Sequence, residues 1–295
     1  MKLNKVVICV ISIFSVTSLK AMDHADVIKQ MKQPKGDKEV MSVSPLAHPI
    51  PIDELFPLKP TPTPSASPRR TMLDKLNLIN QAYAFSPAKP ILPTSISLRQ
   101  FDTPIQNQWN GTCTAHATVA AIENLIRSKT KLSERFHWSK YERYSTDKSL
   151  EAATKSGIAY NTYWPHNFAA PPKPIPSTTQ LTFLTQYKQL NTFDELKAHL
   201  ALNLPAVVAM TTPKDMLSCL SVVRESTEMD LNSGHAIAVV GYGEDLTLKG
   251  KGYFEIKNSW SAQCGDKGYQ FIPYSVCQKP GAYCAFYGFT KAVLR

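Results

Sequence analysis

A chain of 295 residues is long enough for one large domain or two small ones, and 43% hydrophobic with 19% charged residues is typical of a globular core. Lys and Arg outnumber Asp and Glu by 33 to 23, yet no run of basic residues is interleaved with aromatic ones. The basic balance is therefore expected to be a solvated surface, and nucleic acid is excluded as a partner.

The amino terminus has the layout of a secretory signal peptide. Lys2 and Lys5 precede an apolar run over residues 6–16, and small residues follow as far as Ala21. This run is shorter than the roughly 20 apolar residues that span a bilayer. We therefore expect residues 1–21 to be removed and the mature protein to be secreted or periplasmic, with no membrane partner.

Proline dominates the next part of the chain. Residues 44–70 contain eight prolines and no glycine, a composition typical of an extended linker. The whole segment 22–92 has two interpretations that the sequence leaves open. It is either a plain spacer or a pro-segment that covers the active site until it is cut away.

Regular structure is expected to begin near Leu98, within a domain that covers residues 93–295. Val119, Ile122 and Ile126 fall on one helical face and predict a helix from about Cys113, with Thr112 as its cap. Further helices are predicted over residues 132–153 and 193–204. Short runs rich in Val, Ile and aromatics predict strands at 204–210, 235–243 and 252–260. Because the predicted helices precede the predicted strands along the chain, an α+β protein of two lobes is favoured.

The cysteine count is odd once the signal peptide has left. Of six cysteines, Cys9 lies in the signal, so five remain. In an oxidising compartment one thiol is then unpaired, and Cys113 stands where the positive end of a helix dipole would stabilise its thiolate. Two disulfides are expected among the other four, with three possible pairings: Cys219, Cys264, Cys277 and Cys284.

Two polar residues at strand ends have the chemistry that a thiolate nucleophile needs. His235 opens the predicted strand 235–243, so its imidazole would project from a rigid support and exchange a proton with Cys113. Asn258 ends the alternating part of the predicted strand 252–260, and a buried amide carbonyl can accept the second imidazole N–H and fix the ring. Trp260 follows, and an aromatic ring beside this bond would exclude water.

Three blocks of the sequence resemble papain-like cysteine peptidases, the peptidase C1 family. QNQWNGTCTAHA is similar to the nucleophile motif, NSGHAIAVVGYG to the histidine block, and YFEIKNSW with GDKGY to the asparagine block. They occur in the family's order. The resemblance extends from about residue 93 to the end, and the chain is identified as a divergent member of bacterial type.

The resemblance implies a fold and a set of roles. The fold would have a helical first lobe and an antiparallel β-rich second lobe, with the active-site cleft between them. Cys113 would be the nucleophile, His235 its base and acid, and Asn258 the orienting residue, while Gln108 would serve the oxyanion hole and Trp260 would shield the histidine. The substrate would be a peptide or protein, the enzyme a monomer made as a zymogen, and no metal or organic cofactor would be needed.

Several residues depart from the family's pattern. Gln108 lies five residues before Cys113, where the family usually has six, and Gln106 lies seven before it. Gln108 is the preferred candidate of the two. The first-lobe cysteine that precedes the nucleophile is missing, so that lobe's bridge is expected to be absent. Ser261 replaces a glycine, and Cys264 replaces a second tryptophan.

Two other functions are compatible with these residues. The same triad would serve an acyltransferase if an amine, rather than water, attacked the acyl-enzyme. The altered flanks of Cys113 are also compatible with a catalytically silent papain fold that acts by binding. Product analysis with an added amine separates the first alternative from hydrolysis, and labelling of Cys113 by a thiol-directed epoxide separates the second.

Overall fold

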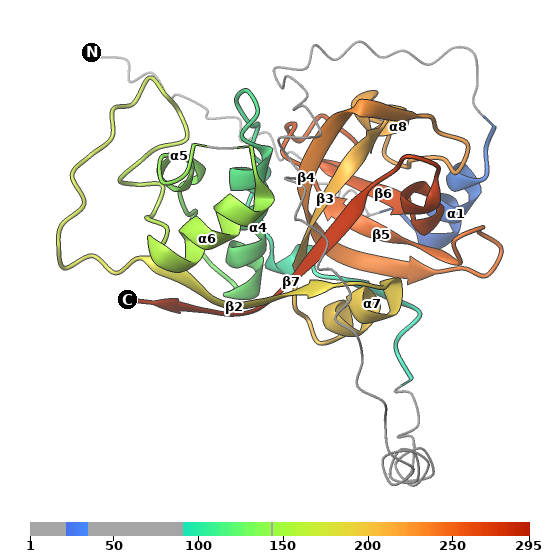
Figure 1. The fold of residues 1–295 in the computed structure, drawn as a ribbon, viewed down its shortest axis with the longest axis horizontal. Helices are drawn as coiled ribbons and strands as arrows, with labels where there is room; N and C mark the ends of the chain where they lie inside the picture. Colours follow the sequence, from blue (N-terminus) through green and yellow to red (C-terminus); the bar gives the residue numbers. More distant parts are fainter. Residues whose placement is uncertain (1–21, 35–90, 143) are drawn as a thin grey trace, which may run out of the picture.

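The computed structural model describes residues 22–34, 91–142 and 144–295, which form two lobes (Figure 1). The first lobe is helical and the second is built on a large antiparallel sheet, so the predicted α+β two-lobe architecture is confirmed. The predictions for residues 1–21 and for the proline-rich run 44–70 lie outside the described residues.

The first lobe contains α4 (Cys113–Leu125), α5 (Glu134–Trp138) and α6 (Thr146–Lys155). The helix predicted from Cys113 is confirmed, but its predicted cap is wrong. The Thr112 hydroxyl donates to the Trp109 carbonyl at 2.6 Å and makes no capping bond. The single helical region expected over 132–153 is two helices, and Glu142 between them has a left-handed φ of 44° that a helix cannot contain.

The sheet has seven strands, in the order β2-β7-β3-β4-β5-β6 with β1 paired to β4, and every pairing is antiparallel. The three predicted strands correspond to β3, β4 and β5, and the other four were not predicted. The strands are β1 (Ser95–Ser97), β2 (Thr182–Leu190), β3 (Ala206–Pro213), β4 (Met229–Glu244), β5 (Gly252–Lys257), β6 (Tyr269–Pro273) and β7 (Cys284–Leu294). The remaining elements are α1 (His24–Met31), α7 (Phe193–Ala201), α8 (Lys214–Leu217) and the 3-10 turns η1 (Arg99–Phe101) and η2 (Tyr274–Gln278).

Strand β3 is buried at every position because it lies between two hydrophobic cores. Side chains alternate across a strand, so Ala206, Val208 and Met210 enter the core of the second lobe. Val207 and Ala209 face the opposite way and join the core that includes α4. This double burial explains why β3 reads as a continuous apolar run rather than an alternating one.

Helix α4 packs on the sheet through small side chains. Ala117, Ala120 and Ala121 of the helix share a buried cluster with Ala236 and Ala238 of β4. Side chains of this size let the helix backbone come close to the strand. The packing therefore places the first residue of α4 directly beside β4.

Helix α1 docks on the second lobe, away from α4 (Figure 1). Val27 and Met31 are fully buried and Ile28 nearly so, and they pack against Tyr253 of β5 and Phe271 of β6. The sequence showed only a short amphipathic stretch here, too small for a core of its own. It becomes stable by burying its apolar face against the sheet.

Two disulfides form in the second lobe and select one of the three possible pairings. Cys219 bonds to Cys264 and Cys277 bonds to Cys284. Among the described cysteines, Cys113 alone has a free thiol. Both bridges lie in the second lobe, which agrees with the expectation that the first lobe has none.

The two disulfides are predicted to contribute unequally to stability. Cys219–Cys264 closes a loop of 45 residues and Cys277–Cys284 one of 7. Loop-closure entropy gives about 4 kcal/mol for the first bridge and about 2 kcal/mol for the second. Urea unfolding of the paired Cys→Ser variants, each compared with the parent chain, measures the difference. An equal or reversed order would contradict the entropic account.

Candidate active site

Cys113 is the first residue of α4 and lies 1% exposed at the junction of the helix with β4. The backbone N–H groups of Ala236, Thr114 and Cys113 itself face its sulfur. One of these donors belongs to the strand and the others to the helix terminus. An anion on this sulfur would thus be stabilised from both elements.

His235 lies within β4 rather than at its start, so the predicted strand boundary is wrong by six residues. It pairs with Met210 of β3, immediately after an irregularity in the register between Thr211 and Thr212. The extra residues at this point lengthen β4 toward Met229 without disturbing the pairing of His235. The imidazole is therefore mounted on a central, doubly paired strand and is 3% exposed.

The His235 ring is held in one tautomer by Asn258. Nε2 of His235 lies 3.0 Å from Oδ1 of Asn258, and the same oxygen accepts the Ser259 N–H at 2.7 Å. An amide oxygen only accepts hydrogen bonds, so Nε2 of His235 carries the hydrogen and donates it. Nδ1 of His235 is then the nitrogen that carries the lone pair.

The orientation of Asn258 depends on Gln270, which the sequence interpretation missed. Nδ2 of Asn258 donates to Oε1 of Gln270 at 2.7 Å, and Nε2 of Gln270 donates to the Leu220 carbonyl at 2.7 Å. Gln270 is fully buried in β6. A glutamine inside the otherwise apolar run of that strand was the available signal, because a buried amide needs partners.

Trp260 covers the bond between the histidine and the asparagine. Its ring stacks on that of His235 with centroids 4.4 Å apart and an angle of 20°. Asn258 itself is 2% exposed. The hydrogen bond therefore lies in a dry environment, where it is stronger than in water.

Gln108 is tied to the residue that follows Asn258. Oε1 of Gln108 accepts from the Ser259 hydroxyl at 2.6 Å, and its Nε2 donates to the Asn110 carbonyl at 3.0 Å. With its oxygen fixed, the amide nitrogen is the end that faces the loop leading to Cys113. Gln106 is half-buried and contributes a backbone carbonyl, which accepts the Ser261 N–H at 3.3 Å.

The two departures near Trp260 have structural reasons. Ser261 adopts a left-handed φ of 70°, which explains the glycine of the family pattern, and its hydroxyl accepts the Gln263 N–H. Cys264 forms the disulfide to Cys219. The loop after Trp260 is thus anchored covalently where the family has a second tryptophan.

Burial sets the charge state of the thiol and the imidazole. It raises the pKa of Cys113 to about 12, against the lowering effect of the three N–H groups. Burial also lowers the pKa of His235 to about 4, opposed by the hydrogen bond to Asn258 and reinforced by nearby His116. At neutral pH Cys113 is therefore a neutral thiol and His235 a neutral imidazole, and its Nδ1 lone pair could accept the thiol proton.

The chain is similar to known cysteine proteases in both sequence and fold. The profile described as papain family cysteine protease matches residues 92–284. Among curated proteins, cathepsin S from Mus musculus is 26% identical over 199 residues, covering 60% of this chain and 58% of the relative. The chain thus spans less than two thirds of the length of that relative.

Solved structures share the fold at low sequence identity. Xylellain, a cysteine protease from Xylella fastidiosa, superposes with a TM-score of 0.55 at 21% identity, over 71% of this chain and 91% of that one. The ragweed pollen cysteine protease Amb a 11, solved in its proform, gives a TM-score of 0.56 at 20% identity, over 71% and 68%.

The pKa values predict an unusual pH profile for alkylation of Cys113 by iodoacetamide. The rate should be flat from about pH 5 to 9, because neither Cys113 nor His235 gains or loses a proton to solvent in that range. It should fall roughly tenfold per pH unit below about 4, where His235 becomes protonated and no longer accepts the thiol proton. Intact-mass kinetics measures the rate, with circular dichroism as a check on folding.

A short cysteine peptide is the matched control, since its rate rises tenfold per pH unit up to a pKa near 8.5. A folded protein that follows the same rise, or that loses reactivity with a midpoint near 6.5, would contradict the paired arrangement.

Proposed function

This chain belongs to the papain family of cysteine proteases, and we propose that it is a secreted endopeptidase that hydrolyses peptide bonds through a thioester on Cys113. The observation that carries the proposal is the hydrogen bond from His235 to Asn258 beside a buried free thiol. Hydrolysis needs a nucleophile, a proton carrier and a group that orients the carrier. These three side chains have those chemistries.

Acylation of the enzyme would use the tautomer that Asn258 fixes. The Cys113 sulfur attacks the peptide carbonyl carbon while its proton passes to Nδ1 of His235. The backbone N–H of Cys113 and Nε2 of Gln108 stabilise the resulting oxyanion. The carbon–nitrogen bond then breaks, His235 gives its proton to the departing amine, and the acyl group remains on sulfur as a thioester.

Deacylation would reverse the roles of the same groups. A water molecule attacks the thioester carbonyl while His235 takes its proton, and the carbon–sulfur bond breaks. His235 then gives this proton to the Cys113 sulfur, and the carboxylic acid product leaves. The enzyme is thereby returned to its starting state. Ser259 supports both steps because it bonds Gln108 through its hydroxyl and Asn258 through its N–H.

We further propose that residues 22–92 form a pro-segment. Helix α1 fixes the beginning of this segment on the second lobe, through the buried side chains of Val27 and Met31. The fold is shared with a related protease that was solved in its proform.

The two disulfides support an extracytoplasmic location. Within the described residues, no helix has the length and apolar character needed to cross a bilayer.

The first functional test is intact-mass spectrometry after incubation with a cysteine-peptidase epoxide inhibitor. We expect a single adduct on the wild-type protein, because an activated thiol opens the epoxide, and none on the Cys113→Ala variant. The same spectrum reports the mature amino terminus. Peptide hydrolysis should fall by at least about a thousandfold in the variant.

Two results would overturn the proposal. A folded, reduced and trimmed protein that forms no adduct would indicate a binding role for the fold. An adduct with no hydrolysis, but with amide formation when an amine is added, would indicate an acyltransferase.

Gln270 is predicted to be a positioning residue for the catalytic asparagine. Gln270→Leu should lower kcat about tenfold, because Asn258 is then free to present its NH₂ group to His235. KM should not change, since Gln270 is fully buried and cannot touch substrate. Gln270→Glu is the matched control: its protonated carboxyl can still accept from Asn258 and donate to the Leu220 carbonyl, so kcat should be largely retained. Equal kcat in the Leu variant and the wild type would refute this role.

A further inference from the structure

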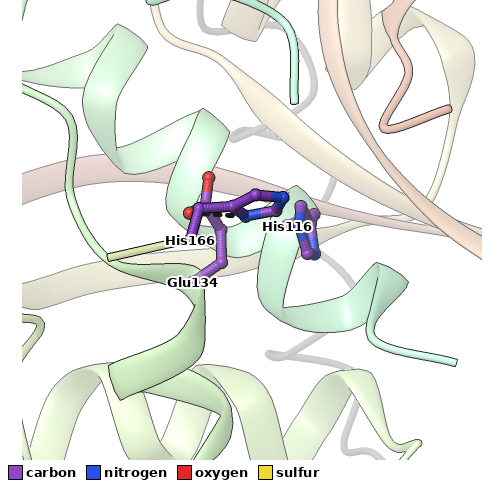
Figure 2. Close-up of side chains that lie close together, drawn as sticks. All are labelled: His116, Glu134 and His166. Atoms are coloured by element: carbon purple, nitrogen blue, oxygen red, sulfur yellow. Dashed lines mark ion pairs between the residues drawn. The ribbon is translucent and has the colours of Figure 1, made fainter. Parts of the chain in front are cut away.

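A second group of chemically suited side chains lies one helical turn beyond Cys113. His116 from α4, Glu134 from α5 and His166 from the segment after α6 converge (Figure 2). One nitrogen or oxygen from each lies within 4.8 Å of the other two. None of the three is used in the peptidase mechanism.

Each histidine has its outer ring nitrogen occupied by a backbone carbonyl. Nδ1 of His116 lies 2.9 Å from the Thr112 carbonyl, and Nε2 of His166 lies 2.9 Å from the Asn107 carbonyl. A carbonyl only accepts, so these nitrogens carry the hydrogens. The opposite nitrogens then present lone pairs toward the cluster, which is the second-sphere arrangement that metal-binding histidines use.

The three inner atoms have no hydrogen-bond partner among the described residues. They are Nε2 of His116, Oε2 of Glu134 and Nδ1 of His166. His116 is 3% exposed and Glu134 only 1%. Burying such groups without partners costs free energy, so three of them facing one another point to a ligand that satisfies all three.

A small space adjoins the cluster. A cavity lined in part by His116, Glu134 and Lys257 has a volume of about 10 Å³. That is room for roughly one water molecule. His166 is 22% exposed at its side chain, which provides a route from solvent.

The charge of the surroundings is compatible with a cation. Lys131 contacts Glu134 through Oε1 at 2.8 Å and Glu123 through Oε2 at 3.0 Å. Lys257, which lines the same cavity, lies 3.7 Å from Oδ1 of Asp102. The three carboxylates of Asp102, Glu123 and Glu134 therefore exceed the two ammonium groups by one formal negative charge. Oε1 of Glu134 faces the lysine, which leaves Oε2 for a different partner.

We propose that His116, Glu134 and His166 bind a divalent transition-metal ion of the Zn²⁺ type. Two imidazoles and a carboxylate are a common donor set for Zn²⁺, with a water as fourth ligand. Zinc bonds of about 2.1 Å require ligand atoms about 3.4 Å apart. The partly exposed His166 side chain would therefore move inward by about an ångström toward the two buried ligands.

The ion would join three parts of the first lobe. His116 belongs to the helix that carries Cys113, and His166 is bonded to Asn107, the neighbour of Gln108. Trp109 makes T-shaped contacts with both imidazoles, with ring centroids 4.9 and 5.0 Å away. Metal binding would therefore stiffen the loop that leads into the nucleophile helix and stabilise the folded lobe.

The test uses the full chain with Cys113→Ala, which removes the thiol as a competing zinc ligand and makes the outcome independent of peptidase activity. Competition with a chromophoric chelator measures Zn²⁺ affinity. We expect one ion per chain, a rise in Tm with added Zn²⁺, and intense visible bands on Co²⁺ substitution. Adding His166→Gln should weaken binding at least about a hundredfold.

The matched control is His24→Gln in the same background, because His24 is also half-buried and also bonds through one ring nitrogen, to Tyr253. Its Zn²⁺ affinity should equal that of the parent. No binding by the folded parent, or equal affinity in the His166 variant, would overturn the metal site. The cluster would then be an ion pair between Glu134 and His166, whose atoms lie 3.8 Å apart.

Discussion

The close packing of α4 on β4 is the constraint on which the rest of the structure depends. Alanines on both elements let the helix approach the strand, so Cys113 lies where the N–H of Ala236, the neighbour of His235, faces its sulfur. A larger side chain at Ala236 or Ala238 would separate the two lobes at this point. Overpacking of a tight core is destabilising, and here it would also move the thiol away from the imidazole.

A chain of buried amides and hydroxyls then fixes the details. Gln270 orients Asn258, Asn258 orients His235, and Ser259 links this set to Gln108. Each bond has low exposure to water, so each is stronger than on a surface, and each group left unpaired would be costly. The network therefore holds one arrangement rather than several.

The same helix carries a second polar cluster. His116 follows Cys113 by about one turn of α4. Cys113 contacts the sheet, whereas His116 lies near Glu134 of α5. The proposed ion would act on the loop around Trp109, and that loop also contains Gln108. Stability of the first lobe and geometry of the oxyanion side would thus be coupled through a few residues.

The sequence by itself determined the features that depend on neighbours in the chain. The helix from Cys113, the strand containing His235 and the three short motifs were readable, because periodicity is local. The strand before Asn258 was also predicted, but β5 ends at Lys257, three residues before the predicted end. Only the tertiary structure decided the disulfide pairing, the roles of Gln270, Glu134 and His166, and the strands β2 and β7. Thr112 shows the same limit. Its backbone, with φ −86° and ψ 22°, lies outside the β region typical of a capping residue, and its hydroxyl donates to the Trp109 carbonyl. These outcomes depend on which distant residues meet, and a local pattern contains no information about the partner.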